Sequence, residues 1–219
     1  MDEIILVDKP AGITSFDVIR QLRKRLGVRK IGHAGTLDPL ATGLMILGVG
    51  PGTKRLTEFI KLDKEYLAEI RIGESRTTGD LEGEIIETKV VSNLLESAVR
   101  SALASMVGEL ILPVSAYSAI KVDGVPMYKR ARQAAQAGSM VTEVPIRTMR
   151  VGVAELLKFT QVGDIAVANV RFAVGSGTYI RSLGEELGQR LGYPATLQLL
   201  RRTKVGEFDI TDAKQIEDF

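Results

Sequence analysis

The stretch GHAGTLDPLATGLMILGVG, residues 32–50, joins a glycine-rich loop to a continuous apolar run. The run LMILGVG has the composition of a buried strand. Gly32, Gly35 and Gly43 permit backbone angles that other residues resist, and Asp38 is the loop's one carboxylate. Because Asp38 precedes a proline, it is biased towards an extended conformation. The loop is either a turn with a capping carboxylate or a backbone cradle that holds Asp38 for chemistry.

Several familiar loop chemistries do not fit this stretch. Its glycine spacing matches neither GxxxxGK[ST] nor GxGxxG, and the neighbouring GVGPGTK, which ends at Lys54, also lacks the phosphate-loop spacing. The chain has one histidine, His33, and no cysteine. These counts argue against a catalytic zinc ion and leave only His33 as a base for Ser-His-Asp hydrolysis. What remains is a carboxylate assisted by arginine, lysine or tyrosine.

A short strand and a basic helix are expected before the loop. IILVD, residues 4–8, is typical of a strand, and residues 14–27 have a helical period. Thr14 or Ser15 can cap this helix, Asp17 suits its first turn, and Gly27 suits the position after its end. The basic residues lie mainly on the outer face, so the helix is predicted to be amphipathic with a positive exterior. Its inward-facing residues are Val18, Ile19, Leu22 and Leu26.

The pattern after the loop predicts an α+β fold. Residues 51–60 are expected to form a helix capped by Thr53, with Leu56, Phe59 and Ile60 facing inward. Residues 65–73 alternate as a strand does, and residues 113–147 are irregular and expected to form an inserted lobe. Strands joined by hairpins, with helices between them, predict a mixed sheet. Further strands are expected at 84–90, 151–159, 165–174 and 199–210, and helices at 94–108, 128–138 and 178–192, followed by a short acidic helical tail.

Composition and charge narrow the class of protein. The 219 residues are 45% hydrophobic and 26% charged, which is ordinary for a globular domain. The net charge is only +2, but residues 20–30 hold six basic side chains and no acidic one, and smaller clusters occur at 129–132 and 201–204. Such clusters suit contact with a polyanion, although each alone could be a solvated helix face. The acidic N-terminus lacks the features of a signal peptide and the longest apolar stretch is too short to span a bilayer, so a cytoplasmic location is expected.

Two other side chains have both a functional and a structural interpretation. Arg181 is placed in the first turn of a helix, where a positive charge opposes the helix dipole at a cost of about 0.3–1 kcal/mol. It either serves a site or forms a surface pair with Glu185, four residues on. Tyr66 opens a strand on its apolar face, where it is either core or an aromatic shelf for a base.

The sequence resembles a known family in several ordered blocks. GHAGTLDPLATGLMILGVGPGTK closely resembles the signature of the TruB family, the bacterial tRNA pseudouridine-55 synthases. The blocks VDKPAGITSFDV, DKEYLAEIRIG, YSAIKVDGVPMYKRAR and GSGTYIRSLGEELG are also similar to that family's and follow in its order. The resemblance covers essentially the whole chain. It implies a mixed, mainly antiparallel sheet flanked by helices, with an inserted thumb at about 113–147 that closes on RNA.

The resemblance also implies roles for particular residues. Asp38 matches the family's catalytic aspartate, Tyr66 its active-site tyrosine, and Arg181 the arginine that pairs with the aspartate. Leu200 matches a leucine of the uracil pocket, and His33 a histidine near the displaced nucleotide. Lys9 matches a lysine that supports the site. The remaining residues assigned to substrate or RNA binding are Lys54, Lys121, Tyr128, Tyr179, Arg201 and Arg202.

The activity implied is isomerisation of the T-loop uridine of tRNA to pseudouridine, with the base flipped into a pocket and no cofactor or metal. The partner implied is the tRNA T-arm, and a monomer is expected. Members commonly carry a C-terminal PUA domain, whereas this chain is expected to be one catalytic domain, 1–219, without it. Two alternatives are a guide-RNA-dependent pseudouridine synthase and a non-catalytic tRNA-binding or tRNA-folding protein. The sequence leaves three roles open for Asp38: attack at C1′, attack at uracil C6, or removal of the C2′ proton.

Overall fold

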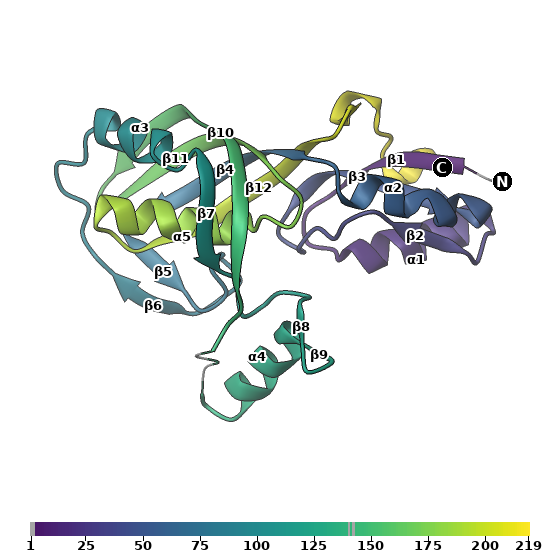
Figure 1. Cartoon of the computed structure of the whole chain (residues 1–219), viewed down its shortest axis with the longest axis horizontal. Coiled ribbons are helices and arrows are strands. Elements are labelled where there is room, and N and C mark those ends of the chain that lie inside the picture. The colour runs from purple at the N-terminus through teal and green to yellow at the C-terminus, as the bar shows by residue number, and fades with distance from the viewer. Residues whose placement is uncertain (1–2, 140, 142) are drawn as a thin grey trace.

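The structure, a computed structural model, describes residues 3–139, 141 and 143–219. Its central feature is a nine-stranded sheet with the order β1-β3-β12-β4-β11-β10-β7, in which β2 adds to β3 and β13 to β12 (Figure 1). Of the described strand pairs in this sheet, only β12 with β3 is parallel. The prediction of a mixed, mainly antiparallel sheet flanked by helices is therefore confirmed.

The N-terminal part of the sheet is built from β1 (Glu3–Lys9), β2 (Ile31–His33) and β3 (Thr42–Val49). The helix α1 (Ser15–Leu26) packs against it, and its boundaries follow from its caps. The Thr14 side chain accepts a hydrogen bond from the Asp17 N–H while Asp17 accepts one from the Thr14 N–H, and Gly27 ends the helix with φ +64°. Seven of the eight β3 residues are buried, as their continuous apolar run predicts.

The C-terminal part of the sheet contains the longer strands. Its described elements are β4 (Lys64–Ile72), α3 (Glu96–Ala104), β7 (Gly108–Pro113), β10 (Ile146–Val162), β11 (Ile165–Val174), α5 (Ile180–Leu191) and β12 (Ala195–Val205). β5 (Glu74–Arg76) and β6 (Ile85–Thr88) form a separate hairpin. The main core includes buried residues of α1, α3 and α5, so these three helices cover the same face of the sheet. No helix in the described ranges is long and apolar enough to cross a membrane.

The sequence misplaced the caps or boundaries of several helices and strands. Thr53 caps no helix, because residues Gly50–Arg55 form a 3-10 turn (η1) that starts earlier, with the Thr53 hydroxyl bonded to the Gly50 carbonyl. The α2 helix (Leu56–Ile60) buries Leu56 and Phe59 but leaves Ile60 exposed. The last strand begins at Ala195 rather than 199, and a short β13 (Phe208–Asp209) follows it. The short acidic tail is helical as predicted, but in two separate 3-10 helices, η2 (Ile210–Asp212) and η3 (Ile216–Asp218).

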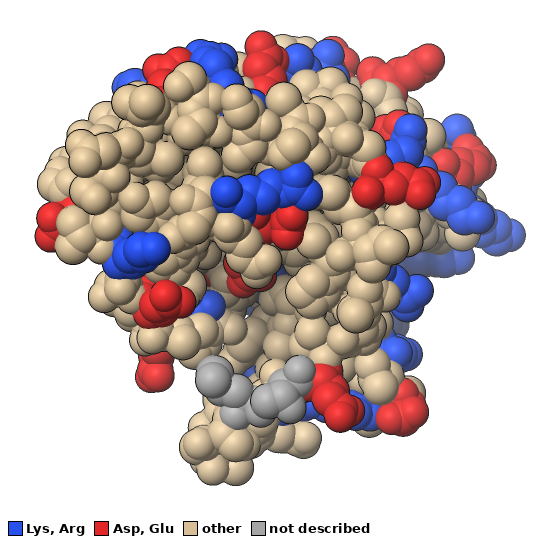
Figure 2. Space-filling model, turned by 60° about the vertical axis from the view of Figure 1, so that its left-hand side comes forward, with Lys and Arg blue, Asp and Glu red and all other residues tan. Residues whose placement is uncertain are grey.

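Residues 114–145, called the lobe below, leave the sheet between β7 and β10 (Figure 1). The described lobe contains a hairpin of β8 (Lys121–Val122) and β9 (Val125–Pro126), followed by the helix α4 (Met127–Gln136). In Figure 2 a hollow separates the lobe, at the bottom of the view, from the body of the protein. The lobe is therefore placed where it borders an open depression of the body.

The two parts of the sheet meet at the parallel contact of β3 with β12. Thr42 and Gly43 lie in register with Arg201 and Arg202. Gly43 has φ +106°, and a Cβ on it would lie 2.7 Å from the backbone nitrogen of Arg202. Only glycine permits this close approach, because any side chain would overlap the backbone of β12. The loop that carries Asp38 enters the sheet directly at this junction.

We predict that Gly43→Ala destabilises the fold by on the order of 2–4 kcal/mol, because it combines backbone strain with overlap at the junction. Gly27→Ala is the matched control, since Gly27 also has a positive φ but no atom within 4 Å of its added Cβ. The control should lose only about 1–2 kcal/mol. Urea unfolding of the three proteins measures both changes, and equal losses in the two variants would contradict the role given to the junction.

Candidate active site

The loop that contains Asp38 is held by side chains of α1 and β1. From α1, the Ser15 hydroxyl accepts a hydrogen bond from the Leu37 N–H at 2.8 Å and donates to the Leu37 carbonyl at 2.9 Å. From β1, the Lys9 ammonium donates to the carbonyls of Pro39 at 3.2 Å and Ala41 at 2.6 Å. Because the loop's backbone groups are occupied in this way, its conformation is fixed before any ligand binds.

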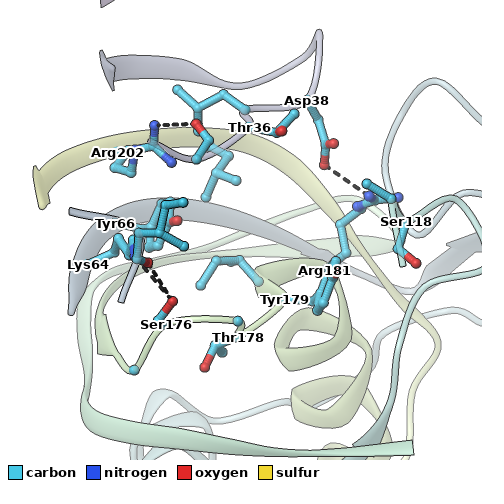
Figure 3. A pocket seen from close by; sticks show the side chains of 18 of the residues that line it. Thr36, Asp38, Lys64, Tyr66, Ser118, Ser176, Thr178, Tyr179, Arg181 and Arg202 are labelled. Carbon is cyan, nitrogen blue, oxygen red and sulfur yellow. Dashed lines mark hydrogen bonds and ion pairs between the residues drawn. The ribbon is translucent and has the colours of Figure 1, made fainter. Parts of the chain in front are cut away.

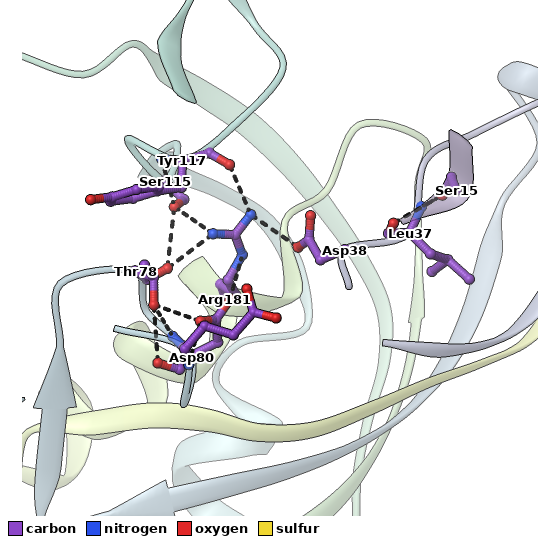
Figure 4. A network of polar contacts seen from close by, with 9 residues as sticks. Ser15, Leu37, Asp38, Thr78, Asp80, Ser115, Tyr117 and Arg181 are labelled. Atoms are coloured by element: carbon purple, nitrogen blue, oxygen red, sulfur yellow. Dashed lines mark hydrogen bonds and ion pairs between the residues drawn. The ribbon is translucent and has the colours of Figure 1, made fainter. Parts of the chain in front are cut away.

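The Asp38 side chain points away from these supports and towards α5 (Figure 4). Its Oδ2 lies 3.0 Å from Nη2 of Arg181, and 39% of the Asp38 side chain is exposed. The carboxylate is partly accessible and is held by a cation rather than by backbone groups of its own turn. The geometry therefore favours the cradle over the capping turn, the two interpretations that the sequence left open.

Arg181 is the centre of a polar network. Its side chain is only 5% exposed, so its interpretation as a surface arginine paired with Glu185 is wrong. Nη1 donates to the Thr78 carbonyl and to the Ser115 hydroxyl, both at 2.9 Å, and Nη2 donates to the Tyr117 carbonyl at 3.2 Å (Figure 4). A buried guanidinium needs this many acceptors, and together they fix the direction in which it meets Asp38.

Asp80 provides a second carboxylate on the other side of the guanidinium. It is buried, and its Oδ2 lies 3.8 Å from Nε of Arg181. The Asp80 Oδ1 accepts hydrogen bonds from the Thr78 hydroxyl and from the Glu82 N–H at 3.1 Å. Asp80 thus compensates the buried charge of Arg181 while Asp38 keeps one side open to solvent.

A cavity of about 320 Å³, the first cavity, opens beside Asp38 and Arg181 (Figure 3). The Tyr66 ring from β4 and Leu200 from β12 form part of its wall, and Ile60, exposed at the end of α2, lines it as well. Polar groups are supplied by Thr36, Lys64, Ser176, Thr178, Tyr179 and Arg202. This combination of a flat apolar wall with a few polar groups suits a planar polar ring.

Burial shifts the pKa of three groups in or near the cavity. It lowers the pKa of Lys64 to about 8, with the charge of Arg202 acting in the same direction. It lowers the pKa of Lys9 to about 8 as well, although Asp38 opposes the shift. Burial raises the pKa of Tyr179, so that hydroxyl stays protonated at neutral pH. The cavity therefore offers hydrogen-bond donors from the Lys64 ammonium and the Tyr179 hydroxyl.

A second cavity of about 460 Å³ lies on the other side of Asp38 and Arg181, and both residues line both cavities. Its wall combines Phe16 at the start of α1 and His33 at the end of β2 with Tyr128 and Arg132 of the lobe. The His33 Nδ1 accepts a hydrogen bond from the Gly35 N–H at 3.2 Å, and burial lowers the pKa of His33. His33 is therefore neutral at pH 7.

The structure brings some of the expected binding residues to the cavities and not others. Lys9 and Arg202 lie within the supporting structure, since Arg202 is buried and its Nε donates to the Leu44 carbonyl at 2.7 Å. In the described chain Lys54, Lys121 and Arg201 line neither cavity. Arg201 instead forms a two-point ion pair with Asp8, at 2.7 and 3.1 Å. Its assignment to RNA stays a prediction, as do those of Lys54 and Lys121.

Three residues of the site were missed by sequence reasoning. Lys64 belongs to the same alternation as Tyr66, and this was a usable signal, because a lysine on an apolar strand face is unusual. Asp80 lies in a polar loop with no local pattern that points to Arg181. Ser15 was considered only as a helix cap, whereas its hydroxyl bonds to Leu37 in the loop.

The chemistry available at the site is that of a carboxylate between two cavities. Asp38 can act as a nucleophile or a base towards a ring in the first cavity, with Arg181 fixing its orientation. In the described residues there is no group of three or more acidic or histidine side chains with the geometry to hold a metal ion.

Comparison with known proteins identifies similar sequences over almost the whole chain. Residues 23–180 match the model of the TruB family pseudouridylate synthases, N-terminal domain. A tRNA pseudouridine synthase B from Leifsonia xyli subsp. xyli is 43% identical over 216 residues, which are 97% of this chain and 70% of that protein. Its counterpart from Opitutus terrae is 42% identical over 217 residues, which are 99% of this chain and 86% of that protein.

Solved structures show the same arrangement. A chain from a Cbf5–Nop10–Gar1 complex superposes with a TM-score of 0.71 at 25% identity, and a chain from an H/ACA ribonucleoprotein bound to a substrate RNA with 0.69 at 25%. Each match covers 98% of this chain but only about half of the other, 52% and 51%. The similarity therefore extends over the sheet and its helices together.

The buried Lys9 makes the stability of the fold depend on pH. Its pKa lies near 8 in the folded protein and near 10.5 when unfolded, so between these values the unfolded state binds more protons and the free energy of unfolding rises with pH. We predict that the stability of the wild type relative to Lys9→Met increases between about pH 8 and 10. Urea unfolding of both proteins at a series of pH values measures this difference in stability. Lys64 titrates in both proteins, so its contribution cancels. A stability difference that does not change with pH would contradict the lowered pKa of Lys9 in the folded protein.

Proposed function

The chain belongs to the TruB family of pseudouridylate synthases, and we propose that it converts the uridine at position 55 in the T-loop of tRNA to pseudouridine. The substrate follows from its similarity to tRNA pseudouridine synthase B of several bacteria. The observation that carries the proposal is the Asp38–Arg181 pair on the wall of a cavity lined by Tyr66 and Leu200.

The reaction breaks the bond between ribose C1′ and uracil N1, turns the base, and joins C1′ to uracil C5. The hydrogen on C5 leaves as a proton, and N1 gains one, so no atom or electron is exchanged with a co-reactant. The protein must therefore supply a nucleophile or base, a proton acceptor and a dry pocket. The described site contains candidates for each of these tasks.

In this proposal the target base leaves its stack and enters the first cavity. Flipping a base costs a few kcal/mol, which contacts to the rest of the RNA must offset. Tyr66 stacks on the uracil ring, and Leu200 closes the wall and keeps water from the detached sugar. The Tyr66 hydroxyl can help to remove the C5 proton after reattachment.

Asp38 carries the chemical step and Arg181 positions it. The carboxylate is available for attack at C1′, attack at uracil C6 or removal of the C2′ proton, because its partly exposed oxygen lies at the border of the cavity. Arg181 is fixed by three acceptors besides Asp38 and Asp80, so it keeps the carboxylate in one orientation while the base turns. Arg181 thus acts mainly through geometry.

The lobe would serve as an RNA clamp. It borders the second cavity through Tyr117, Ala119, Tyr128 and Arg132, opposite the start of α1. An RNA strand that places its target base in the first cavity must pass between the lobe and α1. Lys121 and Arg130 then provide positive charge near the strand, which phosphate contacts require.

The similarity to Cbf5 structures keeps a guide-RNA-dependent enzyme as an alternative. The higher identity to tRNA pseudouridine synthase B of bacteria, 43% against 25%, favours tRNA as the substrate. Activity on an unmodified tRNA transcript, with no other RNA or protein added, separates the two alternatives. Turnover only in the presence of a guide RNA would favour the alternative.

We predict that Asp38→Asn abolishes turnover, with a loss of at least ~10²–10⁴-fold, while tRNA binding remains. The measurement uses a tRNA transcript tritiated at uracil C5, and the released tritium is mapped to the T-loop uridine. Asp63→Asn is the matched control, because Asp63 is also paired with an arginine, Arg150, but lines neither cavity. Binding without tritium release by the wild type would leave a tRNA-binding or tRNA-folding protein.

Arg181→Lys should keep the positive charge but lose most of the fork of hydrogen bonds. We expect kcat to fall by about 10²–10³-fold, as for removal of a positioned donor, while the Kd for tRNA changes little. Single-turnover kinetics with saturating enzyme measure the chemical step directly. A rate within a few-fold of the wild type would show that charge alone is needed and that the network with Thr78, Ser115 and Tyr117 is not.

A further inference from the structure

Phe16 is a large apolar side chain left in solvent beside the site. It follows Ser15 in the first turn of α1, lines the second cavity, and is 58% exposed. The neighbouring Ser15 is buried and holds the loop, so α1 presents a fixed backbone at this point. An exposed aromatic ring on a rigid support next to a functional cavity suits the stacking of a flat ligand.

The Phe16 ring is supported by an arginine. The guanidinium carbon of Arg23 lies 5.7 Å from the ring centroid, a cation–π contact two turns along the same face of α1. The Arg23 Nη2 donates to the Ile31 carbonyl at 3.3 Å, while its Nε is buried and makes no hydrogen bond within the described chain. Arg23 is therefore tied to β2 and keeps the ring in place.

The lobe presents the same motif across the second cavity. Tyr128 lines that cavity, and the guanidinium carbon of Arg132 lies 5.7 Å from the Tyr128 ring centroid. Two arginine-backed aromatic rings from distant parts of the chain thus border one cavity. Single-stranded nucleic acid is held by such alternation of aromatic and basic side chains.

The charges decide which part of an RNA each surface accepts. Three carboxylates, of Asp38, Asp80 and Glu82, and two guanidinium groups, of Arg132 and Arg181, line the second cavity. The negative charges outnumber the positive ones, so its interior accepts a neutral base better than a phosphate. The outer face of α1 has the opposite character, because Arg20, Lys24 and Arg25 are exposed there, followed by Arg29 and Lys30. Arg20 is 71% exposed, and its one ion pair within the described residues is with Asp17, an exposed contact that contributes little.

We propose that Phe16 is a stacking platform for a base beside the target nucleotide, and that the exposed basic face of α1, with Arg20, Lys24 and Arg25, holds the adjoining phosphates. The proposal rests on the proposed function for its ligand, RNA, and adds the course of the strand. The base lies against Phe16 at the mouth of the second cavity, and the backbone follows α1 away from the carboxylates.

The test compares Phe16→Ala and Phe16→Tyr with the wild type, using a T-arm RNA. Loss of one base–aromatic stack should raise KM by ~5- to 100-fold in Phe16→Ala, with kcat changed little, and Phe16→Tyr should restore the wild-type value. Phe219→Ala is the matched control, because Phe219 also has a cation, Lys214, near its ring, but lines neither cavity. It should leave KM unchanged.

A spectroscopic measurement separates stacking from a structural role. With 2-aminopurine in place of each base flanking the target, binding to wild-type protein should quench the fluorescence at one position, and Phe16→Ala should remove that quenching. Loss of activity with quenching unchanged would mean that Phe16 only supports the fold, which overturns the proposal. Equal KM values for wild type and Phe16→Ala would also overturn it.

The phosphate part of the proposal is tested by salt dependence. Lys24→Gln should weaken RNA binding. It should also make the slope of log K against log salt concentration less steep, by the amount expected for the loss of one phosphate contact. Lys158→Gln, at an exposed lysine of β10, removes the same charge away from α1 and should change neither. Equal slopes for both variants and the wild type would overturn the proposal that the basic face of α1 holds the phosphates. If the wild type itself releases no tritium from tRNA, the proposed function fails, whereas an active wild type with unchanged variants refutes only this inference.

Discussion

The buried guanidinium of Arg181 is the constraint on which the site depends. A charge with only 5% of its side chain exposed must be compensated, and no single element of this chain supplies enough acceptors. The compensating groups come from three places in the sequence, all of them outside α5: the Asp38 loop, the loop at 78–80 and the start of the lobe. Pairing this charge therefore brings together the segments that form both cavities.

The second constraint is the glycine at the junction of the sheet. Because Gly43 lets β12 approach β3 closely, the guanidinium of Arg202 reaches back to the Gly35 and Leu44 carbonyls and is buried there. The Asp38 loop is thus fixed by β12 from one side and by Lys9 and Ser15 from the others. Chemistry that requires one orientation of a carboxylate benefits from this rigidity, since no binding energy is needed to order the loop.

The sequence predicted what depends on local pattern. The caps of α1, the alternation of β4 and the buried run of β3 are properties of adjacent residues, and each was found where expected. Thr53 failed as a cap because a 3-10 turn starting at Gly50 replaced the expected α-helical turn. Asp80 and the network around Arg181 depend on contacts between segments about 100 residues apart, for which a single sequence has no local signal. The assignment of Asp38 needed the family resemblance, since its spacing fits a turn as well as a cradle.

The position of the lobe enters directly into the charge network. The Tyr117 carbonyl, near the start of the lobe, accepts a hydrogen bond from Nη2 of Arg181, the same nitrogen that pairs with Asp38. Ser115, two residues earlier, binds Nη1. The segment that borders the second cavity thus also sets the direction of the arginine that pairs with Asp38. If the lobe holds RNA as proposed, RNA binding and the orientation of Asp38 are geometrically linked, because both depend on where residues 115–117 lie.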